Sequence, residues 1–119
     1  MNDRKKLLTE WKAHPPVSGV YEIATKSGGS FLGRSRNLTA IRNRHWFQLE
    51  LGTHPEKALQ TAWNAEGEAG FRFIIVSELE VSAADDEKQR VEDLETLWEL
   101  TLNDLRTKRP KDQFFVLAR

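Results

Sequence analysis

Apolar and polar residues alternate over residues 18–25, which places Tyr21 and Ile23 on one face of the segment. A period of two residues is typical of a β-strand that is covered on one face. The next four residues, Lys26-Ser27-Gly28-Gly29, have the composition of a turn, and a second strand is predicted at 30–34. We therefore expect the two segments to form an antiparallel hairpin.

A third strand is predicted at 71–76, where five of the six residues are apolar. Apolar residues at adjacent positions point to opposite faces of a sheet, so both faces of this segment need cover. We interpret it as a central strand that pairs with the segment 18–25.

Three amphipathic helices are predicted at 37–51, 55–66 and 83–105. In the first of them a spacing of three and four residues puts four side chains on one face, namely Leu38, Ile41, His45 and Leu49. Asn37 is a favourable N-cap, and Gly52 stands where helices commonly end. A short helix is also expected at 3–13, ended by two consecutive prolines.

These elements predict an α/β (α+β) fold, with a small antiparallel three-stranded sheet flanked by helices. The 119 residues, 39% hydrophobic and 30% charged, suit one globular domain. The absence of cysteine excludes disulfides and thiolate metal sites. No apolar stretch has the length of a membrane span or the form of a signal-peptide core, so a cytoplasmic location without a membrane partner is expected.

Charge is distributed unevenly along a chain whose net charge is zero. Residues 1–60 hold ten Lys/Arg and five Asp/Glu, whereas residues 61–119 hold eight and thirteen. The stretch 30–45 contains no acid and four arginines: Arg34, Arg36, Arg42 and Arg44. Such a basic face can bind the phosphates of DNA. The alternative is that these arginines form an ordinary solvated surface.

Several short motifs occur in a fixed order. Gly19-Val20-Tyr21 is followed ten residues later by Phe31-Leu32-Gly33, then by a basic helix with His45, and finally by Glu95 just ahead of Leu97-Trp98. This order resembles the GIY-YIG endonuclease superfamily over residues 18–106. Residues 1–17 are then an N-terminal helix and linker, and residues 107–119 a C-terminal tail.

The resemblance implies metal-dependent hydrolysis of DNA phosphodiester bonds with one divalent cation, Mg²⁺. Tyr21 matches the tyrosine that helps to deprotonate the attacking water, His45 an assisting histidine, and Glu95 the metal ligand. Two positions depart from the family pattern, because Phe31 replaces the second tyrosine and Ile41 replaces the arginine that steadies the phosphate. Loss of one such charge commonly slows phosphoryl transfer by about a hundredfold or more.

Arg42, next to Ile41 on the helix, is one candidate replacement for the missing arginine, and Arg34 is another. The first function considered is therefore a weak or impaired DNA endonuclease. The second is a catalytically inactive module that binds nucleic acid or a protein partner, so the sequence leaves open whether the chain is an enzyme. It also leaves open the preferred DNA and the oligomeric state.

Each candidate residue also has a purely structural interpretation. Tyr21 can be a packed strand aromatic, His45 a hydrogen-bonded core histidine, and Glu95 one of many acids that face water. His54, which precedes a proline, is interpreted first as a residue that starts a helix. The four tryptophans are interpreted first as packed side chains. Trp46, which lies off the main apolar face, is the best of them to contact a nucleobase or a partner.

Overall fold

The computed structural model describes residues 17–79 and 86–117. Its strands are β1 (Ser18–Thr25), β2 (Ser30–Ser35), β3 (Phe71–Leu79) and β4 (Phe114–Val116). Its helices are α2 (Leu38–Leu51), α3 (Lys57–Glu66) and α4 (Glu87–Lys108), with a short 3-10 turn, η1 (Glu68–Gly70), before β3. Within these residues no helix is long and apolar enough to cross a membrane.

The predicted hairpin is confirmed, because β1 pairs antiparallel with β2 through a turn at Gly28 and Gly29. β1 also pairs antiparallel with β3, so the three predicted strands are neighbours in the predicted order. The prediction of a purely antiparallel three-stranded sheet was wrong in one respect. The segment Phe114–Val116 adds a fourth strand, which runs parallel to β2 and completes the order β3-β1-β2-β4.

β3 was predicted to be central, but it lies at an edge of the sheet, and Ile75 is 47% exposed. β3 has apolar residues on both faces because helices cover both faces, and not because it lies between two other strands. Phe71 and Phe73 pack with α2 and α3, whereas Val76 packs with α4 on the opposite face. An edge strand covered by helices on both faces has the same apolar pattern as a central strand.

The predicted helices 37–51, 55–66 and 83–105 correspond to α2, α3 and α4, while the expected helix at 3–13 lies outside the described residues. Asn37 caps α2 as predicted, since its side chain accepts a hydrogen bond from the Ala40 backbone N–H at 2.9 Å. Gly52 ends the same helix. Asp86 caps α4 in the same way, through the backbone N–H of Gln89.

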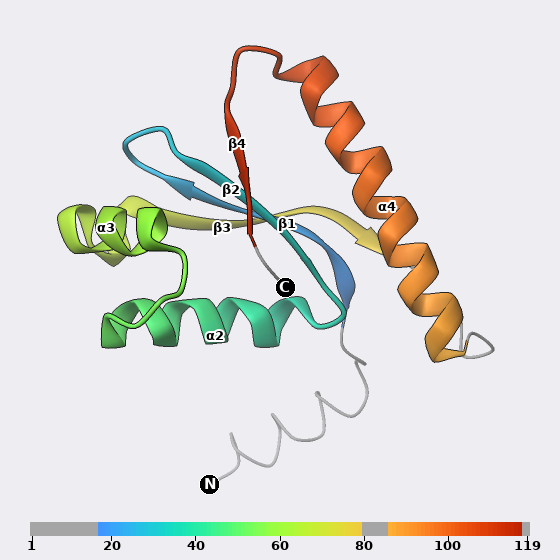
Figure 1. Ribbon diagram of the computed structural model, residues 1–119, viewed down its shortest axis with the longest axis horizontal. Helices are drawn as coiled ribbons and strands as arrows, with labels where there is room; N and C mark the ends of the chain where they lie inside the picture. The colour runs from blue at the N-terminus through green and yellow to red at the C-terminus, as the bar shows by residue number, and fades with distance from the viewer. Residues whose placement is uncertain (1–16, 80–85, 118–119) are drawn as a thin grey trace, which may run out of the picture.

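Two apolar cores lie on opposite faces of the sheet. Tyr21, Ile23 and Phe31 point to the face covered by α2 and α3, which lie together at one side of the strands in Figure 1. Val20 and Leu32 point to the other face and pack with α4. Because successive strand residues alternate between faces, the motif residues of β1 and β2 are divided between the two cores.

Both glycines of the strand motifs stand where a side chain would collide with a neighbour. A Cβ atom on Gly33 would lie 2.4 Å from Cζ and Oη of Tyr21, its partner across the β1–β2 ladder. A Cβ atom on Gly19 would lie 2.1 Å from the backbone oxygen of Ser77, beside a register shift between β1 and β3. Gly33 thus provides the space that the Tyr21 ring occupies.

Candidate functional site

Tyr21 stands in the middle of β1 with its side chain only 1% exposed. Its hydroxyl oxygen lies 2.7 Å from Nε2 of His45, which comes from the sheet-facing side of α2. Nδ1 of His45 lies in turn 2.7 Å from Nε2 of His54, in the loop after α2. The three side chains form one buried hydrogen-bonded chain, here called the Tyr21–His45–His54 chain.

The backbone fixes the direction of this chain. The N–H of Glu56 donates to Nδ1 of His54 at 3.0 Å, so that nitrogen carries a lone pair. A neutral imidazole has one N–H, and in His54 it is therefore on Nε2, from which it is donated to His45. The same argument places the His45 proton on Nε2, which donates to the Tyr21 oxygen. Tyr21 is thus an acceptor toward His45, and its own proton is available for another partner.

The neutral state of both histidines follows from their surroundings. Burial, helped by the neighbouring His54 and the positive charge of Arg44, lowers the pKa of His45 to about 4. Burial also lowers the pKa of His54, although the negative charge of Glu56 opposes this shift. Burial raises the pKa of Tyr21 far above its usual value, and the charge of Arg44 offsets only part of the rise. At neutral pH the site holds two neutral imidazoles and a phenol.

Stability should fall as the pH drops from about 6.5 to about 4, because the unfolded chain then binds protons at His45 that the folded chain excludes. His45 alone contributes up to about 3 kcal/mol to this loss. Urea unfolding across this pH range measures it. In His45→Gln the slope should be shallower, while carboxylates contribute equally to both proteins. Identical slopes for the two proteins would contradict neutral burial of His45.

Glu95 lies on the other face of the sheet from Tyr21. Its Oε1 accepts a hydrogen bond from Nε of Arg34 at 2.9 Å, and the Arg34 guanidinium stacks 4.8 Å from the ring centre of Trp98 on α4. Arg34 directly follows Gly33, which touches Tyr21. Strand β2 therefore separates the Tyr21 hydroxyl from the Glu95 carboxylate, with Gly33 facing one and Arg34 the other.

The four predicted DNA-binding arginines divide into two pairs. Arg34 bonds Glu95, and Arg36 donates to Glu87 at 2.6 Å, so acids of α4 neutralise both. Arg42 and Arg44 are exposed on α2. The Arg42 guanidinium lies 5.0 Å from the ring centre of Trp46. Two of the four arginines are thus paired with acids of α4, and the other two lie on the exposed surface of α2.

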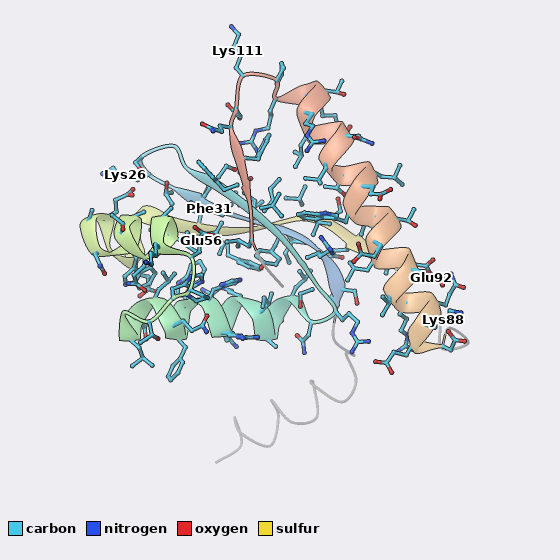
Figure 2. The ribbon with its side chains drawn as sticks, viewed as in Figure 1. Lys26, Phe31, Glu56, Lys88, Glu92 and Lys111 are labelled. Carbon is cyan, nitrogen blue, oxygen red and sulfur yellow. The ribbon has the colours of Figure 1, made fainter. Side chains whose placement is uncertain are left out.

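The two positions that lack the expected polar groups are both packed against apolar neighbours. Phe31 is buried, and its ring stacks on Phe115 of β4 with 5.3 Å between ring centres. Figure 2 shows Phe31 over the strands, toward β4. Ile41 packs against the same core that contains Tyr21. Apolar packing at both positions agrees with the sequence departure from the family pattern.

Sequence reasoning interpreted His54 first as a residue that starts a helix, with a ligand role only second, and gave no role to the residue that holds it. The backbone N–H of His54 donates to Oε1 of Gln60 on α3 at 3.1 Å, and the Gln60 amide donates to the Leu49 backbone oxygen at 3.1 Å. Gln60 thereby ties the end of α2 to the loop that carries His54. A sequence signal for this arrangement is the second histidine, placed nine residues after His45.

Two solved structures share this fold. The catalytic domain of homing endonuclease I-TevI has a TM-score of 0.59 and 20% identity, over 86% of this chain and 99% of that chain. A mutant of the catalytic domain of intron endonuclease I-TevI has a TM-score of 0.56 and 22% identity, over 76% and 82%. No protein-family model matches the chain, and no curated protein does. The chain has a GIY-YIG-like fold with a four-stranded sheet.

Proposed function

We propose that this chain is a DNA-binding domain with a nuclease fold that hydrolyses phosphodiester bonds slowly. The observation that carries this proposal is the Tyr21–His45–His54 chain, in which a tyrosine hydroxyl is oriented by a donated hydrogen bond. Such orientation is what positions a group for proton transfer or for a hydrogen bond to a phosphate oxygen. Support also comes from the endonuclease catalytic domains that share the fold.

Slow cleavage follows from the state of Tyr21. A phenol whose pKa is raised by burial is a poor base for an attacking water at neutral pH. A cation beside it would lower that pKa and would also hold the phosphate. Ile41 has no charge at the position where the resemblance expects an arginine, so both effects are weakened.

Arg44 is the cation best placed to replace the arginine that is missing at position 41. It precedes His45 on α2 and lies three residues after Ile41, on a neighbouring part of the helix surface. Its charge influences Tyr21, His45 and His54. We assign to Arg44 the contact with a DNA phosphate at this site, and Arg42, which lies over Trp46, is not needed for it.

The residues can hold a divalent cation only if the substrate and water supply most of its ligands. Among the described residues no group of three or more acidic, histidine or cysteine side chains could hold a metal ion. Mg²⁺, however, is often bound by one carboxylate together with substrate phosphates and water, and Glu95 is the carboxylate for that role. When bound there, the cation supplies positive charge to the phosphate oxygens. It has to compete with Arg34, whose guanidinium already bonds Oε1.

DNA binding should weaken steeply between low and physiological salt, and Arg44→Ala should weaken it about equally for all sequences. The slope of log affinity against log salt should fall by about one. Fluorescence anisotropy with labelled duplexes measures both effects. Arg106→Ala is a matched control, because Arg106 is exposed near the far end of α4. Equal losses in the two variants, or binding that ignores salt, would refute the assignment of Arg44.

The second candidate is a module that binds DNA without cleaving it. The observation in its favour is the 1% exposure of Tyr21, because a buried hydroxyl needs a local movement before it can meet a phosphate. In that case Tyr21→Phe leaves plasmid nicking at the background level of the wild type and leaves DNA affinity unchanged. Under the first proposal, the same variant lowers a measurable nicking rate.

A further inference from the structure

A cavity of about 630 Å³ opens beside the Tyr21–His45–His54 chain. It is formed by α2, η1 and the start of β3, and its lining residues are Arg42, Trp46, Glu68, Ala69, Phe71 and Phe73. Nothing in the hydrolysis proposed above uses it. The cavity is open to solvent and not enclosed, so a ligand bound there keeps part of its surface exposed.

The walls of the cavity are aromatic and held in place by one another. Trp46 meets Phe71 and Phe73 edge to face, with ring centres 6.3 and 6.1 Å apart. Phe73 in turn stacks on the Tyr21 ring at 5.0 Å, with 20° between the planes. A ligand against Phe73 is therefore separated from Tyr21 by a single ring. Aromatic walls of this kind favour a flat π-system as the occupant.

Two charged groups of opposite sign complete the lining. The Arg42 guanidinium, held over the Trp46 ring, presents a fork of N–H donors. Glu68 presents a carboxylate, which accepts hydrogen bonds. The two charges cancel, and the carboxylate repels a phosphate, so the cavity suits a neutral ring with both acceptors and donors on its edge.

Guanine is the nucleobase whose edges match both the Arg42 guanidinium and the Glu68 carboxylate. Its O6 and N7 form an acceptor pair, which binds arginine in a bidentate manner. Its N1–H and N2 amino group form a donor pair that a carboxylate can accept. None of adenine, cytosine and thymine presents both of these pairs. In a duplex the N1–H and N2 edge is used for pairing with cytosine, so a guanine bound in this way has to be unpaired.

We propose that this cavity binds an unpaired guanine of the DNA, with Arg42 on O6 and N7 and Glu68 on N1 and N2. The inference rests on the proposed DNA binding and adds a substrate class to it. DNA that contains a single-stranded or displaced guanine next to the bond at Tyr21 is then preferred over a fully paired duplex. The base then lies on the aromatic lining of the cavity, with the Phe73 ring between it and the Tyr21 hydroxyl.

The test is fluorescence anisotropy with four labelled single strands that differ at one central position in a run of thymines. This position holds guanine, hypoxanthine, adenine or thymine, and hypoxanthine differs from guanine only by the missing N2 amino group. We expect guanine to bind about tenfold more tightly than thymine or adenine, with hypoxanthine between them. Glu68→Gln should remove the preference for guanine over hypoxanthine, while affinity for the all-thymine strand stays within about twofold.

Glu50→Gln is the matched control, because Glu50 is an exposed acid of α2 that does not line the cavity. It should keep the preference for guanine. Equal affinity for all four strands, or a preference that survives Glu68→Gln, would overturn the cavity assignment and leave DNA binding intact. If no strand binds at low salt while the circular dichroism spectrum stays native, the proposed function itself fails, and the cavity assignment fails with it.

Discussion

Changing Phe31 to Tyr and Ile41 to Arg in one chain should raise the rate of plasmid nicking by about a hundredfold. An arginine at position 41 adds a cation to the apolar core face on which Tyr21 lies, where it lowers the raised pKa of the Tyr21 phenol. It also stabilises charge that develops on the phosphate only in the transition state. The tyrosine at position 31 restores a second hydroxyl on the same face of the sheet.

Three comparisons make this result interpretable, all with nicking followed in the presence of Mg²⁺. Ile41→Gln with Phe31→Tyr adds polarity without charge and should gain far less. Adding Tyr21→Phe or Glu95→Ala to the restored variant should remove the gain. If the wild type already nicks rapidly and Arg44→Ala abolishes this activity, then Arg44 fully replaces the missing arginine. A restored variant that stays folded and inactive would favour the binding module.

Gly33→Ala should destabilise the domain by about 3 kcal/mol, at the upper end of the range for overpacking. The new methyl group would lie 2.4 Å from Cζ and from the hydroxyl oxygen of Tyr21, and this side chain is fully buried and cannot simply move aside. A displaced ring loses the 2.7 Å hydrogen bond to His45, so nicking should also fall. Urea unfolding measures the first effect, and a plasmid assay measures the second.

Gly28→Ala separates this collision from the general effect of replacing a glycine. Gly28 lies in the hairpin turn at φ 97°, where a Cβ has no neighbour within 4 Å. Its replacement should cost about 1 kcal/mol through the backbone alone and leave nicking unchanged. If the two variants are equally stable, then the Tyr21 ring is less tightly confined than the contact at Gly33 indicates.

The parts of the fold that sequence could predict depend on neighbours along the chain. Turn chemistry at Gly28 and Gly29 specifies the β1–β2 hairpin, and Asn37 and Gly52 mark the two ends of α2. In the same way, alternation along β1 places Tyr21 on the inner face, and helical spacing places His45 on the face of α2 that meets it.

The parts that sequence could not predict depend on residues far apart. Arg34 and Glu95 bond across 61 positions, and no local pattern pairs one acid of α4 with one arginine of β2. His54 reaches His45 only because the loop after Gly52 turns back toward α2, in a position that Gln60 of α3 holds by a hydrogen bond. β4 consists of three residues, too few for any period to show.

β4 also bears on how the chain folds as it leaves the ribosome. Ser30–Leu32 of β2 pairs with Phe114–Val116, which is synthesised only after the whole of α4. Until then the outer edge of β2 has unpaired backbone groups and an uncovered Phe31 ring. Such an edge can pair with another nascent chain, so association during synthesis is the hazard that this topology carries. β4 can pair with β2 only late in synthesis. The time needed to translate α4 therefore determines how long this edge of β2 stays unpaired.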